Sequence, residues 1–337
     1  ILPRQREWFH RLGRNQAARF DEYGFSYTTR EMFDAFYPGY GSTWPTMQGG
    51  IGILWEQAGV RGKVIDRSDE TKLHYHDAVR HHYISGLSTI ELAAQHREQL
   101  LADFYQARAD AVRLGQEGAV RDYFLLEGKT PFRAAQLARM LVQNGIEVRR
   151  VKSALRAKLT SMNDGDTQER SVPAGSYHVP LAQPASRLVR TLLDRHTDMG
   201  EEFTKRQLDR LGRRLPDEIY DVTAWSLPLA VGVTCLARRE AAETDSEALP
   251  EPKLAGEVIG GPAKVAYLVS AEDDGVPCAL SQWLQAGLRV HIADQPLKLG
   301  GVQFSRGTLV LKVHENPDSL ADKVAEGGIS GVLFSDE

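Results

Sequence analysis

Apolar residues recur at helical spacing near the start of the chain. Within residues 3–23, Trp8, Leu12 and Phe20 supply much of one apolar face, and most of the other positions are polar. A spacing close to 3.6 residues predicts an amphipathic helix with one face against a core. Gly24 follows the pattern and is expected to end the helix.

A second helical pattern runs from residue 69 to about residue 114 and predicts one long helix or a bent pair. Ser68 or Asp69 is a suitable N-cap, and Gly86 is a candidate kink. The apolar positions of this pattern are expected to form a buried stripe. They include Leu73, Val79, Tyr83, Leu87, Ile90, Leu100 and Phe104.

The rest of the chain alternates short apolar runs with amphipathic segments, which predicts an α/β fold class. Residues 121–151 predict a strand, a helix and a strand, with Pro131 in the first helical turn and Gly145 after the last. This short crossover favours a parallel sheet. Residues 160–175 are polar and predict a loop or a hairpin tip. Further strands are expected at 176–181, 264–270, 289–294, 308–313 and 331–334, and further helices at 185–195, 201–213, 279–286 and 318–325.

A charged stretch with few large apolar residues, at 238–260, is interpreted as a linker. It separates the regions 1–115 and 116–237 from a second α/β module at 261–337. The chain starts with Ile1 directly in a helical pattern, and its last predicted strand has no continuation. We therefore expect an internal piece of a larger protein, with the second module truncated.

Composition narrows the classes of function. The 337 residues are 42% hydrophobic and 26% charged, which is typical of soluble globular protein. The net charge of -4 argues against a dedicated nucleic-acid or anionic-membrane binder. Cys235 and Cys278 both lie in apolar settings, and we expect buried free thiols. No nucleotide-binding glycine motif follows a predicted strand.

One stretch, residues 34–59, combines a binding-type loop with a predicted strand. The loop Tyr-Pro-Gly-Tyr-Gly-Ser-Thr-Trp-Pro starts at Tyr37, and a glycine pair follows it. An apolar strand at residues 51–55 then leads directly to Glu56. Gly-rich aromatic loops at the edge of a regular element are common binding surfaces. A charged acid in an apolar strand is costly without a partner, which makes Glu56 a candidate functional residue.

This order of tyrosine, Gly-Ser-x-Trp, glycine pair, apolar strand and glutamate resembles the last third of the catalytic domain of zinc carboxypeptidases of the carboxypeptidase A type. The resemblance implies that Glu56 is the catalytic glutamate, at the end of a strand of the central sheet. It implies that Tyr37 is the mobile loop tyrosine, with Tyr40 as the rival for that role. It covers about the first 110 residues. Later segments, 176–185 and 220–233, resemble the accessory regions of large bacterial members.

The resemblance also implies the chemistry, which is release of C-terminal residues from peptides. In the family a zinc ion lowers the pKa of its bound water to around 7, and a glutamate takes the proton and later delivers it to the leaving amine. Glu56 would do this, and Tyr37 would close over the peptide. Tyr40, Trp44 and Gly41 would contact the substrate. A secreted or periplasmic location is the expectation from the family.

The zinc ligands of the family, a His-x-x-Glu pair and a later histidine, precede the tyrosine loop. No histidine here is followed by Glu at the third position; the nearest match is His74-x-x-Asp77, which lies after Glu56. Zinc ligands are therefore expected upstream of Ile1, and this chain alone is predicted to be inactive.

Three alternatives remain. The first is a non-catalytic peptide-binding or scaffold relative that lost its zinc site. The second is an amidotransferase-like enzyme, because the plan of the C-terminal module resembles class I glutamine amidotransferase-like domains; no nucleophile elbow is present. The third is a metal site on a helix face shared by His74, Asp77 and His81, although this spacing matches no recognised metal motif.

Overall fold

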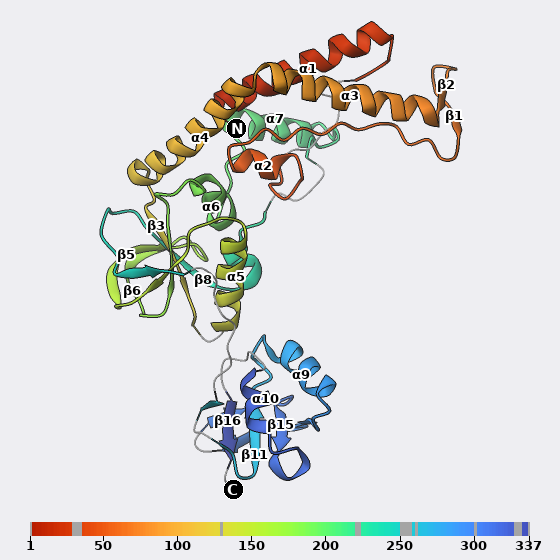
Figure 1. The fold of residues 1–337 in the computed structure, drawn as a ribbon. Coiled ribbons are helices and arrows are strands. Elements are labelled where there is room, and N and C mark those ends of the chain that lie inside the picture. The colour runs from red at the N-terminus through yellow and green to blue at the C-terminus, as the bar shows by residue number, and fades with distance from the viewer. Residues whose placement is uncertain are drawn as a thin grey trace. The chain divides into compact units, whose positions relative to one another are not determined.

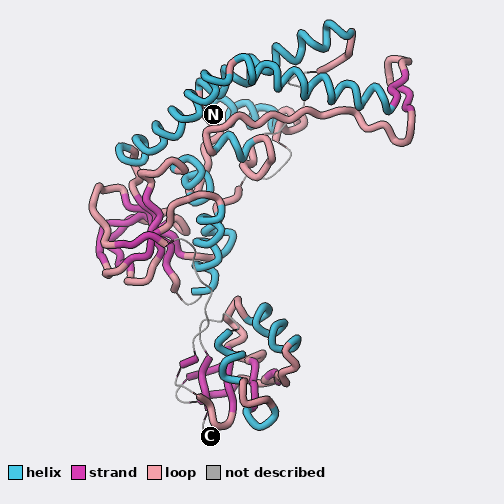
Figure 2. The backbone as a smooth tube through the Cα atoms, in the orientation of Figure 1, coloured by secondary structure: helices cyan, strands magenta, loops and turns pink. Residues whose placement is uncertain are grey.

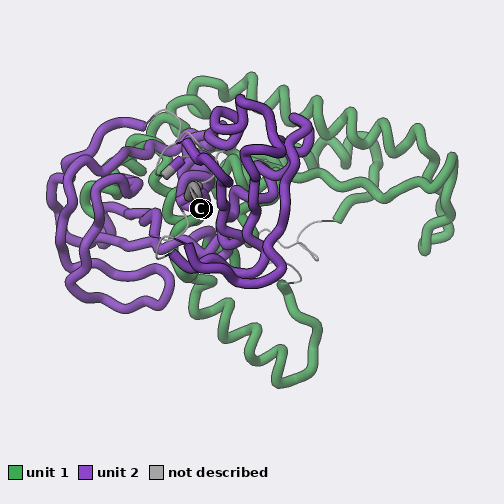
Figure 3. The backbone as a smooth tube through the Cα atoms, turned by 90° about the horizontal axis from the view of Figure 1, so that it is seen from below, with its two compact units in different colours: residues 1–117, 182–226 green, residues 118–181, 227–337 purple. Residues whose placement is uncertain are grey.

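The computed structural model is a mixed α/β structure (Figure 1, Figure 2), and it divides into two compact units. Unit 1 comprises Ile1–Glu117 and Ala182–Ser226, and unit 2 comprises Gly118–Leu181 and Leu227–Glu337 (Figure 3). Unit 1 thus takes in residues that the sequence assigned to region 116–237. The structure describes residues 2–28, 36–128, 131–219, 224–249, 258–259, 262–299, 302–326 and 332–335.

Unit 1 is mainly helical in its described residues. Its elements are α1 (Pro3–Tyr23), α2 (Thr43–Met47), β1 (Val64–Asp66), β2 (Lys72–His74), α3 (Tyr75–Gln95), α4 (Arg97–Glu117), α6 (Ser186–Leu193) and α7 (Glu201–Gly212). None of the helices in the described part of the chain is both long and apolar enough to cross a membrane.

Helix α1 confirms the first prediction. Pro3 lies in its first turn, Trp8 and Leu12 are buried, and Gly24 ends it with a left-handed φ of 68°. It packs along α3, where Asn15 Nδ2 donates to Ser88 Oγ at 2.6 Å and to the Ser88 carbonyl at 3.0 Å. Local periodicity and its terminating residues were sufficient to define this helix.

The predicted start and kink of the second helix are wrong. Residues 64–74 form the antiparallel hairpin β1–β2, and α3 begins only at Tyr75. Asp69 turns this hairpin, because its Oδ1 accepts hydrogen bonds from the Thr71 amide at 3.1 Å and the Thr71 hydroxyl at 2.6 Å. The break between α3 and α4 lies at His96 rather than Gly86.

The predicted buried stripe of this helix pair is largely exposed. The exposed fractions are 52% for Val79, 66% for Tyr83 and 67% for Ile90. Leu87 and Phe104 are exposed as well, whereas Leu73 is buried. The opposite face of α3 is buried and carries Ile84, Ser85 and Ser88. Small polar residues on this face allow α1 to lie close and to form hydrogen bonds. The face that contacts α1 therefore is not the most hydrophobic face of α3.

Unit 2 contains a seven-stranded sheet in which all neighbouring strands are antiparallel. In sheet order the strands are β6 (Thr167–Val172), β5 (Leu155–Ser161), β8 (Thr234–Arg238), β3 (Asp122–Leu126), β7 (Tyr177–Pro180), β4 (Arg149–Val151) and β9 (Ser246–Ala248). Two helices, α5 (Pro131–Gln143) and α8 (Leu227–Val231), belong with it.

The elements of the predicted strand–helix–strand unit are confirmed, but its parallel pairing is wrong. Strands β3 and β4 do not pair with each other. Strand β7 lies between them and is antiparallel to both, with Tyr123 opposite Val179 and Arg150 opposite Tyr177. The connection from β3 through α5 to β4 therefore skips one strand position, and β7, which comes later in the chain, occupies it.

The predicted linker at 238–260 contains parts of this sheet. Arg238 ends β8, and β9 pairs with β4 inside the stretch. The charged residues of this stretch are not all on the surface, because the Arg238 side chain is buried. Residues 250–257 and 260 of the predicted linker lie outside the described residues.

A buried polar network joins four strands of the sheet. Asp122 Oδ2 accepts hydrogen bonds from Nε and Nη2 of Arg238, at 2.9 and 2.6 Å, and its Oδ1 lies 2.7 Å from His178 Nε2. His178 Nδ1 lies 3.0 Å from Ser246 Oγ. A catalytic triad would use the opposite ring nitrogens, and its aspartate would not be paired with a guanidinium. We interpret the network as a structural tie.

The C-terminal module has a five-stranded sheet of order β10–β16–β11–β15–β12. Only the β10–β16 pair is parallel in the described residues, and the other neighbouring strands are antiparallel. The elements of the module are β10 (Val258–Ile259), β11 (Ala266–Val269), α9 (Val276–Gln285), β12 (His291–Ile292), β13 (Leu297–Leu299), β14 (Val302–Phe304), β15 (Leu309–Lys312), η1 (Val313–Glu315), α10 (Leu320–Glu326) and β16 (Val332–Ser335).

The prediction of two buried cysteines is half right. Cys235 is buried as expected, whereas Cys278 is exposed.

The stability of this module depends on pH through Glu315. His291 Nε2 at 2.7 Å and Lys312 Nζ at 3.1 Å lower the pKa of Glu315 from 4.5 to about 2. Because the pKa is lower in the folded state, the carboxylate stabilises the fold above pH 4.5, and this contribution is lost as the pH falls towards 2. The difference in unfolding free energy between wild type and Glu315→Gln should therefore shrink over that range in denaturant titrations. A difference that stays constant with pH would contradict this interpretation.

Candidate functional site

Glu56 lies in residues 51–60, which belong to no helix or strand and form an extended connection between α2 and β1 (Figure 1). The predicted strand with a partly buried carboxylate is therefore wrong for this structure. The side chain of Glu56 is exposed, and no ion pair or hydrogen bond joins its carboxylate to another described residue. The acid is thus available to a group that approaches from solvent.

The side chains of this segment still alternate between two sides, as they do in a strand. Ile51, Ile53 and Trp55 line a cavity against the helices of unit 1, whereas Leu54 is 47% exposed and Glu56 points to solvent. Successive side chains of an extended chain point to opposite faces. The segment therefore has a helix-facing side with odd-numbered residues and an outer side with even-numbered residues.

The start of the segment is in close contact with the aromatic loop. A Cβ atom built on Gly52 would overlap the carbonyl oxygen of Ser42, so the Ser42 backbone covers the outer side at Gly52. Gly52 and Glu56 are four residues apart on that side, or about 13 Å at 3.3 Å per residue. The end of the loop and the carboxylate therefore share one side of the segment.

Gly52→Ala should destabilise unit 1 by about 1–3 kcal/mol, because the added methyl group has no room and the backbone must move. Urea unfolding would measure the change. Gly59→Ala is a matched control, since nothing lies within 4 Å of its Cβ position. Equal stability of the two variants would show that Ser42 does not pack on Gly52.

The loop residues are held by aromatic packing. The rings of Tyr37 and Tyr40 meet edge to face at 5.5 Å, and Tyr37 meets Trp225 at 5.9 Å. The Tyr37 carbonyl accepts a hydrogen bond from Thr43 Oγ1 at 2.7 Å. Trp44 lies in α2, which follows directly. The structure thus brings the two candidate tyrosines together, and Tyr37 is packed rather than free.

Gly41 is exposed and has open space where a side chain would be. Trp225 is the loop partner that sequence reasoning missed. It belongs to the segment 220–233, of which residues 220–223 lie outside the described residues. Its indole Nε1 donates to the Thr191 carbonyl at 2.8 Å, which fixes the ring beside Tyr37. Nothing in the local sequence links Trp225 to the loop.

The histidine-rich face of α3 does not gather as a metal site. The Asp77 carboxylate accepts a hydrogen bond from the His74 amide at 3.0 Å, and this bond lowers the pKa of Asp77. His81 is turned inward, with Nδ1 2.7 Å from Gln57 Oε1 and its ring 4.4 Å from that of Phe25. Burial lowers the pKa of His81. Across the described ranges, no three His, Cys, Asp or Glu side chains are placed to hold a metal ion.

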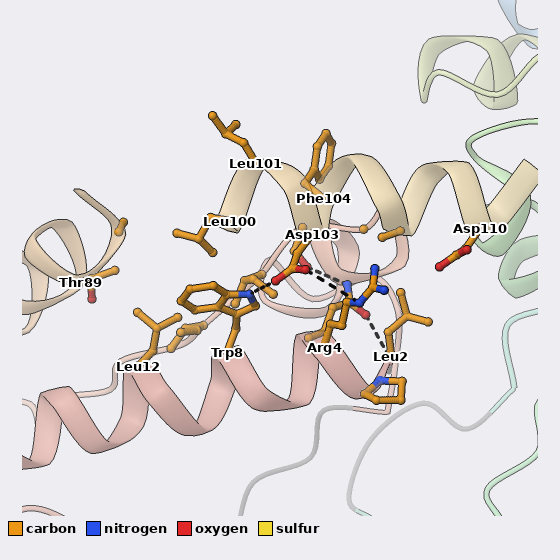
Figure 4. Close-up of a pocket in the computed structure, with 18 of the residues that line it drawn as sticks. Leu2, Arg4, Trp8, Leu12, Thr89, Leu100, Leu101, Asp103, Phe104 and Asp110 are labelled. Carbon is orange, nitrogen blue, oxygen red and sulfur yellow. Dashed lines mark hydrogen bonds and ion pairs between the residues drawn. The ribbon is translucent and has the colours of Figure 1, made fainter. Parts of the chain in front are cut away.

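A cavity of about 690 Å³ lies between α1, α3, α4 and the helix-facing side of the extended segment (Figure 4). It is mainly apolar, and Asp103 is its central polar group. Asp103 Oδ2 accepts a hydrogen bond from Trp8 Nε1 at 2.9 Å, and Oδ1 lies 3.9 Å from Arg4 Nε. The sequence did not indicate this cavity, because its walls come from α1, residues 49–55, α3 and α4, which lie apart along the chain.

No family model, curated protein or solved structure matches this chain.

Proposed function

We propose that this chain is part of a zinc metallocarboxypeptidase in which Glu56 is the general base and acid. The loop and glutamate of the sequence motif support this, together with one structural observation. The Glu56 carboxylate has no described partner and lies on the same side of an extended segment as the end of the Tyr37 loop. A base that acts on a substrate must be free to approach it.

Glu56 would take a proton from the attacking water and deliver it to the leaving amine of the peptide. Both transfers need the Glu56 carboxyl group within about 3 Å of the reacting atoms, first as acceptor and then as donor. The exposure of the side chain permits this approach. The desolvation that strengthens such a base would come from the substrate and the rest of the catalytic domain, since this chain does not supply it.

Tyr37 would hydrogen bond the bound peptide, with Tyr40 as the alternative, and Trp44 and Gly41 would line the substrate path. Tyr37 packs against Tyr40 and Trp225, so its closure over a peptide would require the ring to leave this packing. Such loop movements commonly accompany substrate binding.

The described residues do not fit zinc, because they contain no suitable group of three ligands. The proposal therefore places the zinc ligands in a part of the gene product outside this chain. A non-catalytic peptide-binding relative is the alternative, and the presence of a His-x-x-Glu pair in that part would distinguish the enzyme from the binder.

The test compares this chain with the full-length gene product. Zinc content and hydrolysis of peptides with free and blocked C-termini would be measured on both. The full-length protein should hold zinc and cleave only peptides with a free C-terminus, and this chain should do neither. Tight zinc binding by this chain would contradict the ligand argument, and a zinc-free, inactive full-length protein would favour the binder.

A further inference from the structure

Helix α3 carries its large apolar side chains on the side away from α1. Val79, Tyr83 and Ile90 are each more than half exposed, and Leu87 is exposed beside them. The opposite side of the helix packs along α1 (Figure 1). Single exposed apolar residues are ordinary, but a continuous row of them along a helix is typical of an interaction surface.

The spacing of this exposed row is symmetric along the helix. Val79, Tyr83, Gly86 and Ile90 follow one another at spacings of four, three and four residues, which keeps them on one face. When two copies of α3 cross antiparallel, Val79 therefore lies against Ile90 of the second copy, and Tyr83 lies against Gly86 of the second copy. Each of these contacts then occurs twice. A surface that is complementary to itself in this way is the kind found in twofold dimers.

Gly86 provides the space that such a crossing needs. It is exposed, and nothing lies within 4 Å of the position that its Cβ atom would occupy. Glycine inside a helix lowers helix stability, and within one copy it provides no packing in return. In the antiparallel arrangement, the Tyr83 ring of the second copy covers Gly86. The missing side chain then allows the two helices to approach closely where they cross.

Two charged residues beside the row fit the same arrangement. Arg80 and Glu91 are eleven residues apart, or about three turns, so they lie on one flank of the row. Arg80 lies over the rings of Tyr23 and Phe25, at 5.2 and 5.3 Å, and makes no ion pair within the described part of the chain. Glu91 Oε2 accepts a hydrogen bond from Arg19 at 2.7 Å, and Oε1 has no partner among the described residues. In an antiparallel pair this flank faces the same flank of the second copy, which brings Arg80 of one copy to Glu91 of the other.

We infer that α3 is the interface of a twofold dimer of this chain. The two copies of α3 cross antiparallel beside Gly86, and Arg80 of each copy pairs with Glu91 of the other. The inference goes beyond the proposed function and does not depend on it, because the interface contains no residue of the Glu56 and Tyr37 site. One helix pair is at the lower end of interface sizes, so the dissociation constant should be micromolar, about 1–100 μM.

Sedimentation equilibrium over a concentration series tests the dimer, in this chain and in the full-length gene product. Both should change from monomer to dimer as the concentration rises through the micromolar range. A chain that remains monomeric at about 300 μM would overturn the inference. A full-length protein that remains monomeric where this chain dimerises would overturn it as well, because the rest of the gene product would then cover α3.

Gly86→Gln separates dimerisation from folding. Glutamine suits a helix better than glycine and has open space within one copy, so urea unfolding of the monomer should show equal or higher stability. The new side chain should exclude Tyr83 of the second copy and weaken association about tenfold or more. Association as tight as in wild type would contradict the crossing at Gly86.

A charge exchange tests the antiparallel orientation. Arg80→Glu and Glu91→Arg each bring like charges together at both contacts of their own dimer, so each variant should associate about tenfold more weakly than wild type. An equimolar mixture of the two variants should regain the lost affinity, because opposite charges then face each other at both contacts. Single variants that associate like wild type, or a mixture that associates no better than its components, would overturn the inferred arrangement.

Discussion

Glu56→Gln in the full-length protein is expected to lower kcat/KM for peptides with a free C-terminus by about 1,000-fold or more. Glutamine keeps the shape of the side chain but cannot accept the proton of the attacking water. General acid–base catalysis contributes about 10²–10⁴-fold, and a residue that acts in both proton transfers belongs at the upper end. The loss should appear in kcat, with KM little changed, because the group acts in the transition state. Steady-state hydrolysis would measure both constants.

The matched control is Glu98→Gln, which neutralises another exposed acid of unit 1, on α4. It should leave kcat/KM within about twofold of wild type, since surface substitutions away from a site usually change little. Zinc content should be equal in the two variants and the wild type. A fully active Glu56→Gln protein with normal zinc content would remove Glu56 from the mechanism.

Asp122→Ala is expected to destabilise unit 2 by about 3–5 kcal/mol. The substitution leaves the Arg238 guanidinium, which is only 3% exposed, without the carboxylate that accepts two of its hydrogen bonds. Breaking a buried ion pair by removing one partner has a cost of this size, because a charge stays buried and uncompensated. It also removes the acceptor of His178, on the neighbouring strand β7. Denaturant unfolding would measure the change.

The double variant Asp122→Ala, Arg238→Met provides the control. With the second charge also gone, part of the lost stability should return, so the two substitutions should not be additive. The remaining loss reflects the cavity and the other contacts of Arg238, which include the Ala242 carbonyl and the Thr244 hydroxyl. An additive double variant would show that the pair does not stabilise the sheet as a unit.

The sequence by itself determined the elements whose signals are local. The helices α1 and α5 follow from apolar periodicity, from Pro3 and Pro131 in their first turns, and from Gly24 and Gly145 just after their ends. The strands β3 and β7 were also placed correctly. In each case the signals lie within the element itself or directly at its ends, so short-range physics sufficed.

The tertiary structure alone decided which faces and edges meet. The large apolar residues of α3 predicted a buried stripe, yet α1 packs on the side with Ser85 and Ser88, where a hydrogen bond to Asn15 adds specificity. Strand order is likewise non-local, since β7 enters between β3 and β4 from later in the chain. Sequence spacing carries no information about such long-range contacts.

The same division holds for the site. The sequence placed Tyr37 and Glu56 on one stretch, because that order is a local motif. It could not show that Trp225 packs on Tyr37 or that Ser42 covers Gly52, since both contacts depend on the folded path of the chain. Glu56 is exposed rather than buried for a related reason. A strand is completed by the backbone of its neighbours, and the described part of this chain provides none for residues 51–58.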